Sequence, residues 1–211
     1  MLIPKENEEN LFTYQKSWLR VLYNNMSASF EEFGKNALSI ITYNYDRSVE
    51  HFFVTSLQNS YGRNINDCRA VLKAIPIIHL HGSLGPLPWQ VESGKLNRPY
   101  HFMYNNDLLD EARQHIKIIH ENTDGRDEDF KRANTLLNNA EQIVFLGFGY
   151  NPINLERLQI NAISKGKHVI GTCVGLGAAE QAEVVRVNCP DLSPLDNVDC
   201  YEMVKERMQW R

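Results

Sequence analysis

The amino-acid sequence predicts an α/β fold in which helices cover both faces of a parallel sheet. Three observations support this prediction. Short apolar runs that suit buried strands recur along the chain. Stretches in which apolar residues return every three or four positions, as in helices, separate them. Several of the runs also end abruptly in polar residues or glycine, at the end of the strand where open α/β sheets bind their ligands.

The composition is that of an ordinary globular protein. The 211 residues are 43% hydrophobic and 23% charged, which suits one large domain or a domain with a small appendage. A net charge of -4 argues against a nucleic-acid partner or an anionic membrane surface. No apolar run approaches the roughly 20 residues of a membrane span, and the N-terminus lacks the apolar region of a signal peptide. We therefore expect a cytoplasmic protein whose four widely spaced cysteines are reduced.

Residues 1–37 are expected to form a helical segment ahead of the main domain. Apolar residues at three- and four-residue spacing predict a helix over Glu6–Met26. A second, short helix is predicted between Ser29, as its cap, and Gly34, near its end. The α/β domain is then expected to span residues 38–211.

The first predicted strand, Ser39–Tyr43, leads into the most informative stretch of the chain. The sequence turns polar abruptly at Asn44 and Asp46, and helical spacing then predicts a helix over Arg47–Ser60. Asp46 precedes that helix, where a carboxylate can cap the first free N–H groups. The pair can serve ligand binding at the sheet edge, or it can be only a turn-forming Asn and a capping Asp.

The second predicted strand, Ile75–Leu80, ends in His81-Gly82-Ser83. Gly82 permits a close backbone approach that a side chain would forbid. In a regular strand, His79 and His81 point to the same face, which raises the alternative of a metal site. A structural histidine at a strand end is the stronger interpretation, because no nearby cysteine or carboxylate completes a set of ligands.

An irregular, aromatic loop is predicted over residues 85–106, because Pro86, Pro88, Gly94 and Pro99 punctuate it. A loop of this length is either a lid over a ligand or a packed surface excursion. A helical insert over residues 107–140 follows, as two helices at Asp107–Asn122 and Asp127–Ala140. The apolar stripe of the second helix is expected to face the core.

The third predicted strand, Gln142–Leu146, runs straight into Gly147-Phe148-Gly149. A Gly-x-Gly between a strand and a helix lets the backbone approach a nucleotide. Asn151-Pro152 then starts a helix that is expected to run to about Lys165. The remaining predicted elements are a strand over His168–Thr172, a helix near Ala178–Val187 and a terminal helix through Met208.

Three motifs now stand in order: Thr42-Tyr43-Asn44-Tyr45-Asp46, His79-Leu80-His81-Gly82-Ser83 and Val144-Phe145-Leu146-Gly147-Phe148-Gly149. Together they resemble the sirtuin-like NAD-binding family, particularly its bacterial branch associated with NAD hydrolysis and antiphage defence. The likeness covers the chain from about Leu38 onward. It implies a Rossmann-like domain that takes NAD as its substrate and cleaves the bond between nicotinamide and ribose.

The residue types in these motifs fit that chemistry. Nicotinamide leaves through a cationic, oxocarbenium-like state, which a carboxylate and an amide can orient and stabilise. The attacking water or ribose hydroxyl then needs a base that works near neutral pH, as histidine does. By the resemblance, Asn44 would position the attacking group, Asp46 would contact the nicotinamide end, and His81 would be the base.

The resemblance also implies a set of residues that contact the nucleotide. Gly147, Phe148 and Gly149 would lie along the adenosine ribose, and Gly171 and Thr172 would lie near the adenine. Three further residues expected to bind the nucleotide lie close to the catalytic positions in the first two motifs: Thr42, Tyr45 and Gly82.

Two departures from the family pattern matter. No cysteine lies between Ser83 and Gln142, where sirtuin deacylases carry a four-cysteine zinc module, so we expect no zinc and no lysine deacylase activity. The family also begins with a strand and a Gly-rich phosphate loop, and nothing before Leu38 resembles it. With that first strand–loop–helix unit missing, these residues alone are expected to bind NAD poorly and to cover an open sheet edge with a second copy.

Two other functions remain open at this point. The first is a catalytically inactive domain that senses an NAD or ADP-ribose-like nucleotide or serves as a scaffold. The second is an unrelated α/β enzyme. Turnover of NAD separates the leading hypothesis from the sensor, which would bind the nucleotide and be stabilised by it without cleaving it.

Overall fold

The computed structural model describes residues 15–26, 28–91, 97–100, 128–189 and 191–210. The chain divides into two compact units, Met1–Thr123 (unit 1) and Asp124–Arg211 (unit 2). The boundary that the sequence predicts at residue 38 does not coincide with this division. The predicted helix at Asp107–Asn122 and much of the aromatic loop lie outside the described residues.

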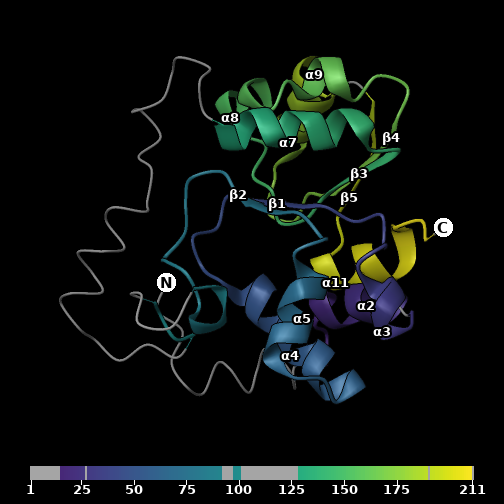
Figure 1. Cartoon of the computed structure of the whole chain (residues 1–211). Coiled ribbons are helices and arrows are strands. Elements are labelled where there is room, and N and C mark those ends of the chain that lie inside the picture. The colour runs from purple at the N-terminus through teal and green to yellow at the C-terminus, as the bar shows by residue number, and fades with distance from the viewer. Residues whose placement is uncertain (1–14, 27, 92–96, 101–127, 190, 211) are drawn as a thin grey trace. The chain divides into compact units, whose positions relative to one another are not determined.

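Unit 1 contains a pair of parallel strands, β1 and β2, in which Thr42 lies opposite His79. Figure 1 shows its helices gathered on one side of this pair. Its described elements, in chain order, are α2 (Trp18–Asn25), α3 (Phe30–Phe33), β1 (Ile40–Thr42), α4 (Ser48–Tyr61), α5 (Ile65–Leu72), β2 (Ile77–His79) and the 3₁₀ turn η1 (Pro88–Gln90).

Local signals explain where the helices of unit 1 begin and end. Gly62, in the left-handed region at φ 63°, terminates α4. Asn64 then caps α5, because its side-chain oxygen accepts from the N–H groups of Asn66 at 2.9 Å and Asp67 at 3.0 Å. The sequence analysis did not predict α5, although Asn64 followed by Asp67 is a helix-start signal.

The core of unit 1 joins the N-terminal helices to α4. Tyr23 on α2 packs its ring against Phe33, Phe52 and Phe53, with centroids 5.3–6.3 Å apart. Phe33 and Phe53 are fully buried. The helical segment predicted ahead of the domain therefore contributes to the same apolar core as the helix after β1.

Unit 2 contains a three-stranded parallel sheet in the order β3-β4-β5. Figure 1 shows α7, α8 and α9 on one side of this sheet and α11 on the other. Its elements are α7 (Glu128–Asn139), β3 (Gln142–Phe145), α8 (Pro152–Arg157), α9 (Ile160–Ile163), β4 (His168–Thr172), α10 (Ala178–Glu183), β5 (Leu192–Asp196), α11 (Cys200–Glu202) and the π-helical turns η2 (Val184–Asn188) and η3 (Met203–Arg207).

The fold confirms a mixed α/β protein with parallel strands, and it differs from the prediction in three respects. The described strands form two small sheets, one in each unit, rather than one continuous sheet. The helix predicted from Asn151 to about Lys165 is broken at Gln159, whose backbone is left-handed at φ 52°. Finally, β5 was not predicted. It contains Pro194, which is tolerated in an outer strand that pairs with β4 in an irregular register.

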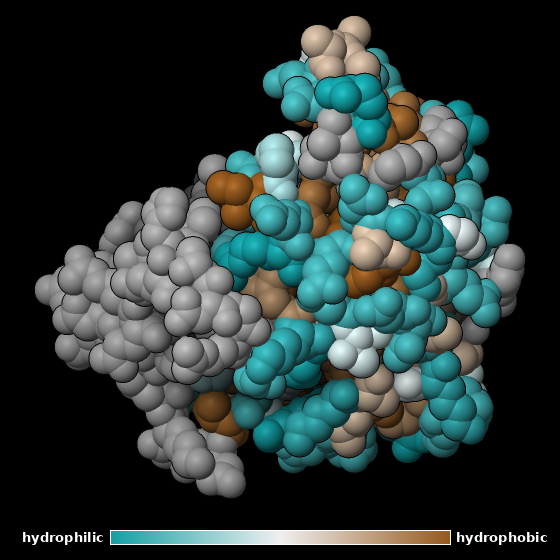
Figure 2. All heavy atoms as spheres, turned by 90° about the horizontal axis from the view of Figure 1, so that it is seen from above, coloured by the Kyte–Doolittle hydropathy of each residue, from teal (hydrophilic) through white to brown (hydrophobic). Residues whose placement is uncertain are grey.

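The described surface is mostly hydrophilic in the view of Figure 2, with small, scattered hydrophobic areas. Among the residues that this structure describes, no helix has both the length and the apolar character that crossing a membrane requires.

Candidate functional site

The carboxyl ends of β1 and β2 bring the first two sequence motifs to one edge of unit 1. The backbone N–H of Leu80 donates to the carbonyl of Thr42 at 2.9 Å, which extends the parallel pairing past the last strand residues. Two residues further along each strand end, Asn44 and His81 occupy corresponding positions at this edge. The strand pairing therefore places two of the three residues predicted to be catalytic at the same edge of unit 1.

Hydrogen bonds fix the loop between β1 and α4 at several points. The N–H of Asn44 donates to the Thr42 hydroxyl at 3.0 Å, and the N–H of Leu84 donates to the carbonyl of Tyr45 at 2.8 Å. Asp46 accepts at 2.9 Å from the N–H of Ser48, the first residue of α4. The N-cap residue of α4 is Arg47, and Asp46 satisfies the first helical N–H from the position before it, with one of its two carboxylate oxygens.

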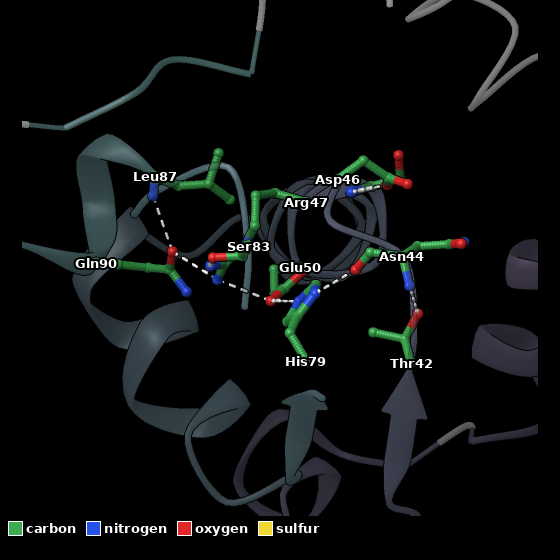
Figure 3. A network of polar contacts seen from close by, with 10 residues as sticks. Thr42, Asn44, Asp46, Arg47, Glu50, His79, Ser83, Leu87 and Gln90 are labelled. Carbon is green, nitrogen blue, oxygen red and sulfur yellow. Dashed lines mark hydrogen bonds and ion pairs between the residues drawn. The ribbon is translucent and has the colours of Figure 1, made fainter. Parts of the chain in front are cut away.

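A buried charged network lies beside this loop (Figure 3). One oxygen of Glu50 is 2.7 Å from the Arg47 guanidinium and 2.9 Å from Nε2 of His79. Glu50 is only 4% exposed. Arg47 also donates to the hydroxyl of Ser83 at 2.8 Å and to the side-chain carbonyl of Gln90 at 2.9 Å. The network thus connects α4, the end of β2 and η1.

The electrostatics of the network favour an ionised Glu50. Burial acts to raise the pKa of this carboxyl, but the hydrogen bond from His79 and the positive charge of Arg47 outweigh that effect. The pKa of Glu50 is therefore lowered below its ordinary value. An ionised carboxylate accepts hydrogen bonds and donates none, which fixes the direction of both contacts.

His79 also reaches the loop itself. Its second ring nitrogen, Nδ1, lies 2.8 Å from the backbone carbonyl oxygen of Asn44. Figure 3 shows the side chain of Asn44 extending away from the network while its carbonyl faces the imidazole. The Asn44 side chain is exposed. Its amide is therefore accessible to solvent, while the backbone of the same residue is held by His79.

His81 is 5% exposed, and its ring lies 5.2 Å from that of Tyr43 at an angle of 55°. The two predicted histidines therefore have different environments, since His79 is in a charged network and His81 lies against an aromatic ring. The metal alternative for this pair gains no support: in the described ranges, no three His, Cys, Asp or Glu side chains converge as a metal site would need.

In unit 2, the residues predicted to contact the nucleotide also gather at strand ends, but they contact one another. The N–H of Gly147, which has φ 58°, donates to the Thr172 hydroxyl at 2.9 Å. The buried hydroxyl of Tyr150 donates to the Thr172 carbonyl at 3.1 Å. Tyr150 covers Gly171 so closely that an added Cβ would overlap its hydroxyl. Phe148 packs between Phe145 and Tyr150.

All four cysteines are free thiols. Burial raises the pKa of Cys68, Cys173, Cys189 and Cys200 above the ordinary thiol value. Since the thiolate is the reactive form, a raised pKa lowers the fraction of each side chain that is nucleophilic near neutral pH.

The sequence analysis missed Arg47, Glu50, Ser83 and Gln90 as members of this site. One signal was present for Glu50, which precedes Phe53, Val54 and Leu57 by three, four and seven residues and therefore shares the apolar face of α4. A charge on the apolar face of a helix needs a partner, because an unpaired buried charge is too costly. The nearest histidine at a strand end, His79, was therefore a candidate partner.

Comparisons with protein-family models, with curated proteins and with solved structures found no match to this chain.

Proposed function

We propose that this chain is a sirtuin-like NAD-binding domain that hydrolyses the bond between nicotinamide and ribose. The observation that carries the proposal is the common strand edge of Asn44 and His81, backed by a buried charged network. Parallel sheets bind ligands at such edges. An exposed amide and a buried histidine at one strand edge are the two groups that hydrolysis at a cationic carbon requires.

The proposed reaction assigns a role to each group. The bond from the ribose carbon C1′ to the nicotinamide nitrogen breaks, and its electron pair leaves with nicotinamide. A water held by the Asn44 amide attacks C1′ and gives its proton to His81, which leaves ADP-ribose and an imidazolium. Asp46 keeps one carboxylate oxygen beyond its cap to α4 for the nicotinamide end of the substrate.

No metal is needed in this reaction, because the substrate already carries the positive charge that drives departure of nicotinamide. We therefore propose NAD as the substrate, with no resident zinc. The polar groups at the strand edge of unit 1 are amide, carboxylate, hydroxyl and imidazole groups, which suit hydrogen bonding to a carboxamide and a ribose.

Nicotinamide release from NAD, followed by chromatography, tests the proposal. In a catalytically complete form of the protein, His81→Ala is expected to lower turnover by about 10²-fold or more, the usual scale for losing a general base. Asn44→Ala is expected to lower turnover as well, because the attacking water loses its hydrogen-bond partner. Lys131→Ala, on the exposed face of α7, is the control and is expected to retain wild-type turnover. Unchanged turnover in His81→Ala would remove His81 from the mechanism.

The sensor alternative has a distinct outcome in the same experiment. A nucleotide that binds only the folded protein raises its thermal stability whether or not it is cleaved. Stabilisation by NAD or ADP-ribose with no nicotinamide release would therefore contradict the proposed hydrolysis and support nucleotide sensing.

A further inference from the structure

The buried network ends at the backbone of Asn44, and this connection has a defined chemical direction. A carbonyl oxygen only accepts hydrogen bonds, so Nδ1 of His79 must donate to it across the 2.8 Å separation. The other ring nitrogen, Nε2, faces an oxygen of ionised Glu50 at 2.9 Å and must donate as well. The two contacts together tie one imidazole ring to the loop after β1 and to Glu50 on α4.

The remaining members of the network hold the imidazole ring of His79 in place. Arg47 shares the same oxygen of Glu50 at 2.7 Å, and its guanidinium is anchored in turn by Ser83 and Gln90. The side chains of Arg47, Glu50 and His79 are 14%, 5% and 9% exposed. Such weakly hydrated, charge-assisted hydrogen bonds are shorter and stronger than neutral ones. The imidazole of His79 is therefore held at Nε2 by Glu50, and its Nδ1 holds the loop between β1 and α4 at Asn44.

We infer that His79 is a positioning residue for the proposed reaction: its Nδ1–H holds the backbone carbonyl of Asn44 and thereby fixes the exposed amide of Asn44 beside the attacking water. This inference rests on the proposed function. In this role His79 acts through the backbone of Asn44, to which its Nδ1 is hydrogen-bonded. Glu50 and Arg47 support it by fixing the orientation of the imidazole.

Two substitutions separate the two hydrogen bonds of His79. The amide nitrogen of an asparagine lies near the position of Nδ1, so His79→Asn keeps a donor for the Asn44 carbonyl. The amide nitrogen of a glutamine lies near the position of Nε2, so His79→Gln keeps a donor for Glu50. The inference predicts that kcat falls by about tenfold in His79→Gln and by less than about threefold in His79→Asn, with KM little changed in both.

Folding stability is expected to rank the same variants in the opposite order. His79→Asn leaves buried Glu50 with Arg47 as its remaining partner, whereas His79→Gln keeps both contacts to the carboxylate. A residue with a purely structural role would lower kcat and stability in the same order. If His79→Gln retained as much kcat as His79→Asn, the positioning role would be refuted.

A spectroscopic measurement keeps this test separate from that of the proposed function. The ¹³C resonance of the Asn44 carbonyl reports loss of its hydrogen bond, and it is expected to move in His79→Gln and to stay near its wild-type value in His79→Asn. Absence of nicotinamide release from the wild-type chain would refute the proposed function alone. An unchanged Asn44 resonance in His79→Gln would refute the connection on which the inference depends.

Discussion

The strand ends of the two units have similar sequence patterns, but different side chains surround them in the structure. In unit 1, the edge after β1 and β2 has an exposed amide at Asn44 and buried charges behind it. In unit 2, the edge after β3 and β4 is closed by the protein's own side chains. Tyr150 covers Gly171, and the Thr172 hydroxyl accepts a hydrogen bond from the N–H of Gly147.

This difference shows which sequence signals carry chemical information. A glycine after a strand fits a nucleotide approaching the backbone, and it fits equally well a neighbouring side chain that packs there, as at Gly171. A buried charge is more specific, since it costs several kcal/mol unless other groups compensate it. The network around Glu50 therefore distinguishes the edge of unit 1 more clearly than the glycines distinguish that of unit 2.

The largest effect on stability is expected when the charge at Glu50 is removed. Glu50→Gln leaves the buried guanidinium of Arg47 without its carboxylate partner, and breaking a buried pair in this way costs about 3 kcal/mol or more. Urea unfolding followed by circular dichroism measures the loss. Glu32→Gln is the matched control, because Glu32 also pairs with a residue three positions along, Lys35, but both side chains are exposed. Glu32→Gln is expected to change the free energy of unfolding by no more than about 0.5 kcal/mol. Equal losses in the two variants would show that burial of the Glu50 pair adds nothing to its contribution to stability.

The pH dependence of this difference has a definite sign. The pKa of Glu50 is lowered on folding from its ordinary value of 4.5. A lowered carboxyl pKa contributes stability that is present above the unfolded pKa and is lost as the pH falls through the folded pKa. The gap in unfolding free energy between wild type and Glu50→Gln should therefore narrow below about pH 4.5. A gap that stays constant into acid would show that Glu50 is not the titrating group.

A smaller effect is expected from filling the closed edge of unit 2. In Gly171→Ala the new methyl would overlap the Tyr150 hydroxyl and approach Cβ of Phe145 to 3.0 Å. Overpacking of this kind costs about 2 kcal/mol. Gly149→Ala is the matched control, because an added Cβ there has no heavy atom within 4 Å among the described residues, and it is expected to be nearly neutral.

A double-mutant cycle sharpens the same prediction. Tyr150→Phe removes the hydroxyl that the alanine methyl would overlap, so Gly171→Ala should cost less in that background than in wild type. Additive free energies in the cycle would show that Tyr150 is not what closes this edge.

The positions of β1, α4 and β4 could be predicted from the sequence because local signals define where these elements begin and end. The run of β-forming residues before Asn44 and the polar switch after it predict β1 and a helix that starts just after Asp46, and both are observed. His168–Thr172 was likewise predicted with the bounds that β4 has. In each case, apolar runs and turn chemistry act over a few residues and need no distant partner.

The predictions failed where tertiary contacts decide the outcome. β5 contains Pro194 and exists because it pairs with β4 at the outer side of the sheet. Gln159 breaks a helix that no glycine or proline marks. The network of Arg47, Glu50 and His79 joins residues 32 positions apart, and only the pairing of β1 with β2 brings them together.

The smallest effect is expected from opening the hydrogen bond that closes the Gly147 turn. Thr172→Val keeps the shape of the side chain but removes the hydroxyl that accepts the N–H of Gly147. Because Gly147 is exposed, water can replace the lost partner, and the expected cost is about 1 kcal/mol. Thr135→Val, on the exposed face of α7, is the control, and its loss of stability should lie within about 0.5 kcal/mol.

The same pair of variants separates the two interpretations of Thr172, as a residue that closes the turn or as one that contacts the nucleotide. If its hydroxyl only closes the turn, NAD affinity measured by calorimetry will be equal in the two variants, whereas a tenfold loss of affinity in Thr172→Val alone would mean about 1.4 kcal/mol of direct contact with the nucleotide.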